Sequence, residues 1–218
     1  LSDKGLKQED SPGCHLSLEI SPQLISCCVL EIKSNTYRYF GEWEIHQAEQ
    51  SHSPEALFGK ETVFQWEFRS LSASLVNPWS TLVPEALFDK TNPSRYLSFN
   101  HVIDRDIEIG VEPIPGFSGI NVSVFDKGCI RILKNKNDKF RVSHQSSILL
   151  SSAFHQYRNR NEKILQIHLD YEWITLLLSE GKQLHFLNSF SYNTPEDIAY
   201  YTLFVCDQLN LNPEKTET

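Results

Sequence analysis

Two short turns carry the side chains that could bind a phosphate group. Backbone N–H groups hold phosphate in such turns, and glycine lets them approach because it has no Cβ. The first turn, residues 19–24, has no glycine and contains Pro22, which lacks an N–H. The second, residues 170–175, places Glu172 where phosphates would sit. We expect both turns to disfavour ATP, and their polar residues contact a cofactor only if a nucleotide binds there. These candidate residues are Ser21, Gln23, Asp170, Glu172 and Thr175.

No other phosphate-binding loop is evident in the chain. Only 9 of the 218 residues are glycine, about 4% against a usual level of about 7%. Neither G-x-x-x-x-G-K-[ST] nor G-x-G-x-x-G occurs. The sequence therefore predicts no cofactor and no catalytic residues, with ATP and Mg²⁺ as the alternative.

A two-metal nuclease is the enzymatic alternative, because several carboxylates could hold metal ions that activate a water. Asp170 and Glu172 would supply two of them, and Glu196 or Asp197 a third. The same residues are more typical of a turn and of a helix start. Acids outnumber bases 28 to 20, and the net charge of −8 opposes binding to nucleic acid. We therefore expect no metal site and no nucleic-acid partner.

Three histidines could also take part in chemistry. His168 and His185, with Asp170, would form a metal cluster if their strands met in one part of a sheet. Single histidines in strands are more often packed or exposed, so we predict no metal ligand among them. His144 follows Ser143, but no G-x-S-x-G sequence surrounds that serine. His144 is the first histidine to mutate, either as a catalytic group or as a partner of local backbone groups.

A repeated pattern of elements positions these residues. Three β-rich runs with short connections predict an antiparallel meander in each half of the chain. A proline then opens a helix in both halves, Pro54 after Ser53 and Pro195 after Thr194. The predicted strands are residues 15–21, 25–33 and 36–46, then 163–170, 173–179 and 183–192. The order strand, strand, strand, helix thus occurs twice, roughly 150 residues apart.

This duplicated unit predicts an α/β protein with mixed sheets and a ribonuclease H-like fold. The arrangement resembles the actin and Hsp70 ATPases, in which two such lobes face each other across a cleft. We predict a first lobe at residues 1–160, with room for an inserted subdomain, and a second at residues 161–218. The second lobe has one helix after its strands, so we expect it to be truncated. The chain also has no methionine, which suggests that residues are missing from it.

Further elements are predicted between the two copies. They are β-rich runs at residues 71–76, 106–113, 120–125 and 140–143, and helices at 128–137 and 145–159. The sequence PEALF occurs at residues 54–58 and again at 84–88, and it predicts two helix starts. The flanking residues differ, so both duplication and chance remain open.

The composition favours a cytoplasmic protein. Five cysteines without a C-x-x-C pair give neither a disulfide framework nor a zinc site, which is typical of reduced cytosolic chains. No apolar run reaches the roughly 18–20 residues that span a membrane. We therefore expect no membrane span.

Several segments carry a resemblance to a known family. They are residues 82–88 (LVPEALF), 141–147 (RVSHQSS), and 187–192 (LNSFSY) with 196–201 (EDIAYY). Over about residues 15–214 the chain resembles the DUF3822 family of uncharacterised bacterial proteins. The resemblance implies an actin-like ATPase fold, related in shape to cell-division and pilus-assembly actin homologues. It implies no activity, because the family has none assigned.

The expected function follows from this fold and from the missing phosphate loops. Together they favour a non-catalytic interaction or scaffold protein with an unknown protein partner. A divergent ATP-binding protein is the alternative, and enzyme activity stays uncertain. A cluster of aromatic residues near the end of the chain is expected to pack in the core, or to bind protein if exposed. Its members are Phe186, Phe190, Tyr192, Tyr200, Tyr201 and Phe204.

Overall fold

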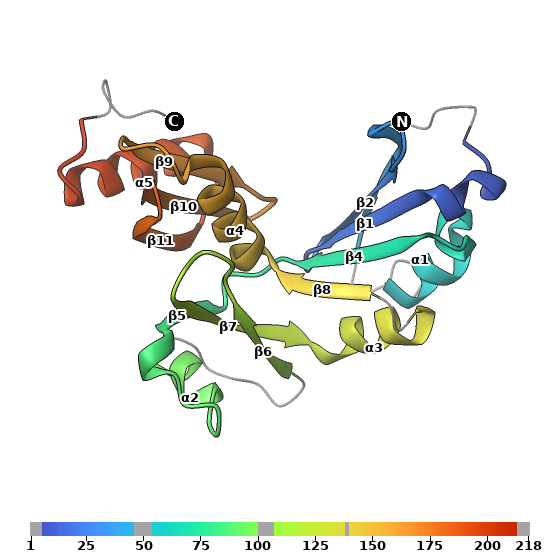
Figure 1. Ribbon diagram of the computed structural model, residues 1–218, viewed down its shortest axis with the longest axis horizontal. Coiled ribbons are helices and arrows are strands. Elements are labelled where there is room, and N and C mark those ends of the chain that lie inside the picture. Colours follow the sequence, from blue (N-terminus) through green and yellow to red (C-terminus); the bar gives the residue numbers. More distant parts are fainter. Residues whose placement is uncertain (1–5, 46–53, 100–106, 138–139, 213–218) are drawn as a thin grey trace. The chain divides into compact units, whose positions relative to one another are not determined.

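The computed structural model describes residues 6–45, 54–99, 107–137 and 140–212 (Figure 1). The chain forms two compact units that alternate along the sequence. The first unit comprises residues 1–81, 90–111 and 122–145, and the second comprises 82–89, 112–121 and 146–218. The lobe boundary at residue 160 stays a prediction.

The first unit is built on a five-stranded mixed sheet with the strand order β3-β2-β1-β4-β8. Strands β1 (Cys14–Ile20), β2 (Leu24–Glu31) and β3 (Thr36–Glu44) form the predicted antiparallel meander. β4 (Ser70–Leu75) pairs parallel to β1, and β8 (Phe140–His144) pairs parallel to β4. All five strands lie within about two residues of their predicted positions.

One face of this sheet carries the core of the first unit. β1 alternates apolar and polar residues, so its apolar side chains all point to the same, buried face. Helices α1 (Pro54–Lys60) and α3 (Lys127–Lys136) pack on that core through Phe58 and Leu133, among others. The second layer of the unit is therefore helical, as the sequence pattern predicts.

A three-stranded sheet with the order β5-β7-β6 is inserted between β4 and α3. Its strands β6 (Ile107–Pro113) and β7 (Gly119–Asp126) were predicted, whereas β5 (Ser80–Pro84) was missed. The second PEALF sequence lies here and does not start an α-helix. Pro84 ends β5, and Glu85–Leu87 form a 3-10 turn before the short helix α2 (Ser94–Leu97). Identical residues thus take different structures because their neighbours pair differently.

The second unit contains an antiparallel sheet between two helices (Figure 1). Its strands are β9 (Lys163–Leu169), β10 (Trp173–Glu180) and β11 (Gln183–Ser191), with β10 in the middle. Helix α5 (Pro195–Gln208) packs on the β10 face that carries Leu176, and α4 (Gln145–Tyr157) packs on the face that carries Leu177. Both faces of β10 are buried, which explains its continuous apolar run.

The three strands of the second unit repeat those of the first in detail. The strands are seven, eight and nine residues long in both meanders. The first residue of β1 pairs with the last residue of β2, and β9 pairs with β10 in the same register. The outer strand carries one extra residue at its third position in each copy, Arg38 in β3 and His185 in β11. Each of these side chains contacts the glutamate that ends the neighbouring strand, Glu31 or Glu180, at 3.1 Å. The predicted duplication is therefore confirmed.

Helix α5 starts as the sequence predicts. Thr194 Oγ1 accepts the Asp197 N–H at 3.3 Å, and Pro195 is the first helical residue. Asp197 Oδ2 accepts the N–H groups of Asn193 and Thr194, both at 2.9 Å, and these bonds lower the pKa of its carboxyl group. Asp197 is therefore a capping residue, as the sequence favoured over a metal ligand. The N-cap predicted for α1, Ser53, lies outside the described residues.

The helices of the described chain are short. The longest, α5, has 14 residues. None of the helices in residues 6–45, 54–99, 107–137 and 140–212 is long and apolar enough to cross a membrane.

Candidate functional site

The first predicted phosphate turn, between β1 and β2, is closed by its own hydrogen bonds. The Ser21 N–H donates to the Leu24 carbonyl at 2.9 Å, and the Leu24 N–H donates to Ser21 Oγ at 3.0 Å. Pro22 has no N–H to donate. The Gln23 carbonyl accepts the Ile45 N–H at 2.7 Å. Two of the backbone donors that a phosphate would need, those of Ser21 and Leu24, are thus bonded inside the turn, and Pro22 provides none.

The second predicted turn, between β9 and β10, is closed in a similar way. The Asp170 N–H donates to the Trp173 carbonyl at 2.8 Å, and the Tyr171 N–H donates to Asp170 Oδ1 at 2.6 Å. The Tyr192 hydroxyl donates to the Asp170 carbonyl at 2.6 Å, and its N–H donates to the Glu172 carbonyl at 3.1 Å. The Asp170 carboxylate therefore folds onto its own turn, next to a second acidic residue.

Thr175 lies within β10 rather than in the turn, because the strand already begins at Trp173. Its side chain is only 3% exposed, and its Oγ1 lies 2.8 Å from Ser189 Oγ on β11. The structure thus keeps Ser21 with Gln23 in one turn and Asp170 with Glu172 in another. Thr175 is engaged in cross-strand pairing instead.

An apolar cavity of about 420 Å³ opens beside the β1–β2 turn, within the first unit. Its volume falls in the range of roughly 300–1,000 Å³ that is typical of ligand pockets. Ser21 and Pro22 line one part of it, and Trp79, which is 44% exposed, lines another. Apolar side chains from β1, β4, β6, β7 and α3 complete the wall, including Ile20, Leu75, Ile107, Val124 and Ile132.

The polar groups of this cavity do not form a catalytic set. Two carboxylates line it, those of Glu55 and Asp126. Asp126 Oδ1 accepts the Cys129 N–H at 2.7 Å and thereby caps α3. Burial raises the pKa of the Cys129 thiol to about 12, so the thiol stays protonated and weakly nucleophilic at neutral pH. The two negative charges also disfavour a triphosphate at this position.

Asn77 and His144 join the ends of β4 and β8 beside the cavity. Asn77 Nδ2 donates to the Val124 carbonyl at 3.0 Å, and Asn77 Oδ1 accepts the Trp79 N–H at 2.9 Å. The same Oδ1 lies 3.2 Å from His144 Nε2, which must therefore be the protonated nitrogen. The His144 ring is 1% exposed and stacks on Phe125 with the ring centroids 6.4 Å apart. His144 thus fixes the side chain of Asn77 by a hydrogen bond, and that side chain in turn fixes the backbone of Trp79.

The burial of His144 argues against the catalytic role that its neighbouring serine invited. Burial lowers its pKa to about 4, so the ring is neutral at pH 7. A general base must reach the proton that it abstracts. The His144 ring, on β8, instead contacts Asn77 and the β7 residue Phe125 in the interior. Its role is therefore structural.

His168 and His185 do not come together as a metal cluster would require. Strand β10 lies between their strands, and His168 pairs with Thr175 while His185 lies beside the Ser179 end of β10. His185 Nε2 instead contacts Glu180 Oε2 at 3.1 Å. Within the described ranges, no three His, Cys, Asp or Glu side chains are placed to hold a metal ion.

The aromatic residues at the end of the chain divide between core and surface. Phe190 and Tyr201 stack with their ring centroids 4.6 Å apart, between β11 and α5. Tyr200 and Phe204 stack at 6.0 Å on α5 and are 61% and 43% exposed. Core packing therefore accounts for most of the cluster, which also includes Phe186 and Tyr192.

Of the residues that line the cavity, sequence reasoning named Ser21 as a candidate and missed the others. Trp79 follows Asn77 and Pro78 directly after a predicted strand, and a tryptophan next to a turn signal was the one available hint. The other residues that line the cavity belong to strands and helices that are distant from one another in the sequence. No spacing rule connects those segments, so only the fold brings them together.

Solved structures with the same fold support this architecture. A Bacteroides thetaiotaomicron protein, described as having an actin-like ATPase fold and unknown function, has a TM-score of 0.83 and 20% identity, over 95% of this chain and 81% of its own. The cytoplasmic domain of EpsL, an inner membrane component of the type II secretion system of Vibrio cholerae, has a TM-score of 0.50 and 16% identity, over 94% and 79%. The PilM-PilN type IV pilus biogenesis complex has a TM-score of 0.51 and 12% identity, over 91% and 66%. The chain therefore has the actin-like ATPase fold that the sequence predicted.

No curated protein sequence matches the chain. The family described as a protein of unknown function, DUF3822, matches residues 3–218. Because this match covers nearly the whole sequence, the chain belongs to the DUF3822 family.

Proposed function

We propose that this protein is a non-catalytic interaction protein that keeps the actin-like frame and binds a partner polypeptide in the cavity of its first unit. The observation that carries the proposal is the state of the β1–β2 turn. The N–H groups of Ser21 and Leu24 bond within the turn, and the space beside it is apolar and flanked by Glu55 and Asp126. Such a site favours an apolar side chain, with a basic neighbour, over a phosphate.

Trp79 is the expected anchor of this interaction. Tryptophan is enriched among the residues that dominate binding energies at protein interfaces. The Trp79 backbone is fixed by its bond to Asn77, while its side chain remains 44% exposed. A preorganised aromatic of this kind loses little conformational freedom when a partner binds.

The fold is compatible with such a role. The solved PilM-PilN structure, which has the same frame, is a complex of two proteins. We also place the protein in the cytoplasm, because all five of its cysteines are free thiols.

We expect Mg-ATP to leave the thermal stability unchanged. A ligand at a hundredfold excess over its Kd adds about 2.7 kcal/mol, which raises Tm by about 5 °C or more in a chain of this size. With about 5 mM Mg-ATP we expect a shift below about 1 °C, because the N–H groups of Ser21 and Leu24 in one turn, and of Asp170 and Tyr171 in the other, are already bonded. The measurement is a thermal-shift titration, with Mg-sulfate at equal ionic strength as the control. A saturable rise with ATP would instead support the divergent ATP-binding protein.

Replacing Trp79 with alanine is expected to reduce partner capture at least about tenfold. The half-exposed side chain can be removed with little effect on the core. The measurement is quantitative affinity capture from native cytoplasm with the wild type and with Trp79→Ala as bait. Tyr37→Ala is the matched control, because Tyr37 is a 70% exposed aromatic of the same unit that does not line the cavity. Equal capture by all three baits would exclude the cavity as the binding site.

A further inference from the structure

Two helices of the first unit begin at its cavity. Helices α1 and α3 contact each other, and the cavity is lined by the first residues of both. α1 contributes Pro54 and Glu55, and α3 contributes Cys129 together with its N-cap, Asp126. An otherwise apolar cavity therefore contains two carboxylates and a thiol on the side where these helices start. We refer to Glu55, Asp126 and Cys129 as the acidic corner.

The Cys129 thiol reports that both carboxylates act on the same point. Burial is the largest cause of its raised pKa of about 12. The charge of Asp126, a hydrogen bond to Asp126 and the charge of Glu55 raise this pKa as well. The thiol is thus within electrostatic reach of both acids, although they belong to different helices.

The described chain supplies no basic partner for these charges. Glu55 and Asp126 are both exposed, and neither forms an ion pair with another described residue. Lys127 follows Asp126 in the sequence but does not line the cavity. The start of a helix contributes only about half a positive charge, which is less than the full charge of one carboxylate. The acidic corner therefore keeps a negative potential and favours a cation.

The other residues of the cavity favour an organic cation over a metal ion. Within the described ranges, no three His, Cys, Asp or Glu side chains are placed to hold a metal ion. The wall beside the acidic corner is apolar, with Ile107, Val124 and Ile132, and Trp79 adds a ring that is 44% exposed. A bound cation must therefore carry an apolar part as well as a charge.

An arginine side chain has these properties. Its apolar stem can pack against aliphatic residues while its charged end stays with the carboxylates. Its guanidinium group has enough N–H donors for two separate carboxylates, and it also stacks on aromatic rings such as that of Trp79. Lysine carries a more compact and more strongly hydrated charge, so it loses more hydration on entering an apolar cavity.

We propose that the partner polypeptide inserts an arginine side chain into the cavity, with the guanidinium group at the acidic corner and the stem against the apolar wall. This inference rests on the proposed function, because it names the residue that the partner brings to the same cavity. The ion pairs strengthen as the partner excludes water from the exposed carboxylates. The arginine then selects the partner, while Trp79 provides apolar contact.

The test is affinity capture from native cytoplasm with the double variant Glu55→Gln and Asp126→Asn as bait. Both changes remove a charge and keep the shape of the side chain, and asparagine caps a helix about as well as aspartate. We expect capture to fall at least about tenfold, and the remaining capture to depend less on salt. Glu42→Gln with Glu67→Gln is the matched control, because both are exposed glutamates of the same unit that do not line the cavity.

A second measurement uses defined probes in place of the partner. N-acetyl-arginine methylamide is titrated into the isotope-labelled protein, and the lysine and citrulline analogues serve as comparisons, since citrulline has nearly the shape of arginine without its charge. The NMR signal of the Trp79 indole N–H, identified by its loss in Trp79→Ala, is expected to shift with the arginine compound. We expect a smaller shift with lysine, none with citrulline, and none with any probe in the double variant.

The arginine assignment is wrong if the double variant captures as much partner as the wild type. It is also wrong if citrulline or lysine shifts the Trp79 signal as strongly as arginine does. Self-association that the double variant abolishes would assign the cavity to a second copy of the chain instead. Loss of capture with Trp79→Ala but not with the double variant removes the arginine and leaves the proposed function, whereas full capture with Trp79→Ala removes the proposed function itself.

Discussion

Acidification from pH 7 to pH 4 is expected to cost this protein about 3 kcal/mol of folding free energy through His144 alone. The pKa of the buried ring is about 4 in the folded state, against about 6.5 in an unfolded chain. The unfolded state therefore binds the proton first as the pH falls. The stabilisation is complete above about pH 6.5 and is lost progressively down to about pH 4.

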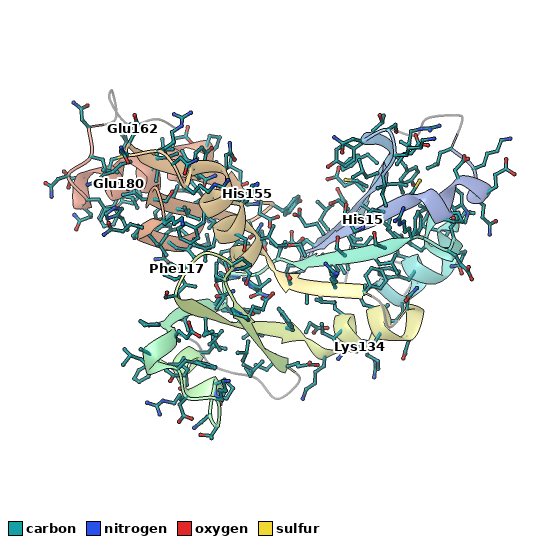
Figure 2. All side chains as sticks on the ribbon, in the orientation of Figure 1. His15, Phe117, Lys134, His155, Glu162 and Glu180 are labelled. Carbon is teal, nitrogen blue, oxygen red and sulfur yellow. The ribbon has the colours of Figure 1, made fainter. Side chains whose placement is uncertain are left out.

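Urea denaturation of the wild type and of His144→Gln at both pH values isolates this contribution. Glutamine retains a donor for Asn77 Oδ1 but does not titrate, so the stability difference between the two proteins should shrink by about 3 kcal/mol on acidification. His155→Gln, on the exposed side of α4 (Figure 2), is the control for removal of a histidine as such. A difference that does not change with pH would mean that the His144 ring is accessible to protons in the folded protein.

Leu176→Ala is expected to destabilise the second unit by about 3–4 kcal/mol, within the usual range of about 2–5 kcal/mol for a buried leucine. Leu176 is fully buried at the centre of the middle strand and packs with Leu165, Leu178 and Val205 beneath α5. The flanking strands pair with β10 on both sides, so the sheet has little freedom to collapse into the cavity.

Hydrogen exchange of the β10 amides measures this cost directly, because it reports the opening free energy of the unit to which they belong. Leu203→Ala is the matched control: Leu203 is 57% exposed on α5, and its truncation should change stability by less than about 0.5 kcal/mol. A cost below about 1 kcal/mol for Leu176→Ala would contradict the close packing of α5 on this sheet.

The duplicated meander could be predicted from sequence because its information is local. The apolar alternation of β1, the short turns and the capped proline at the start of α5 each span only a few residues. The Thr194 and Asp197 pair behaved as its spacing predicted. Register within each hairpin then follows from the turn, since a shift by one residue would turn the apolar side chains to water.

The remaining parts depend on contacts between distant segments. Strand β5 is only five residues long, and its partner β7 lies some 40 residues further along the chain. The local sequence of β5 therefore carries little signal for a strand. The sequence placed Thr175 both in the turn at residues 170–175 and in the strand at 173–179, and the strand is correct because β10 begins at Trp173. The cavity could not be predicted from sequence, because it also depends on contacts between distant segments. Asn77, Val124 and His144 are adjacent only after the two sheets have formed.

The extra residue in each outer strand has a consequence for solubility. The hydrogen-bonded ladder is interrupted at Arg38 in β3 and at His185 in β11. The Arg38 side chain contacts Glu31, and the His185 side chain contacts Glu180. A bulged edge of this kind is a poor template for aggregation, because an unfolded chain cannot add to it in continuous register. Both copies of the meander thus carry the same protection against growth into fibrils, each on one outer strand of its sheet, β3 or β11.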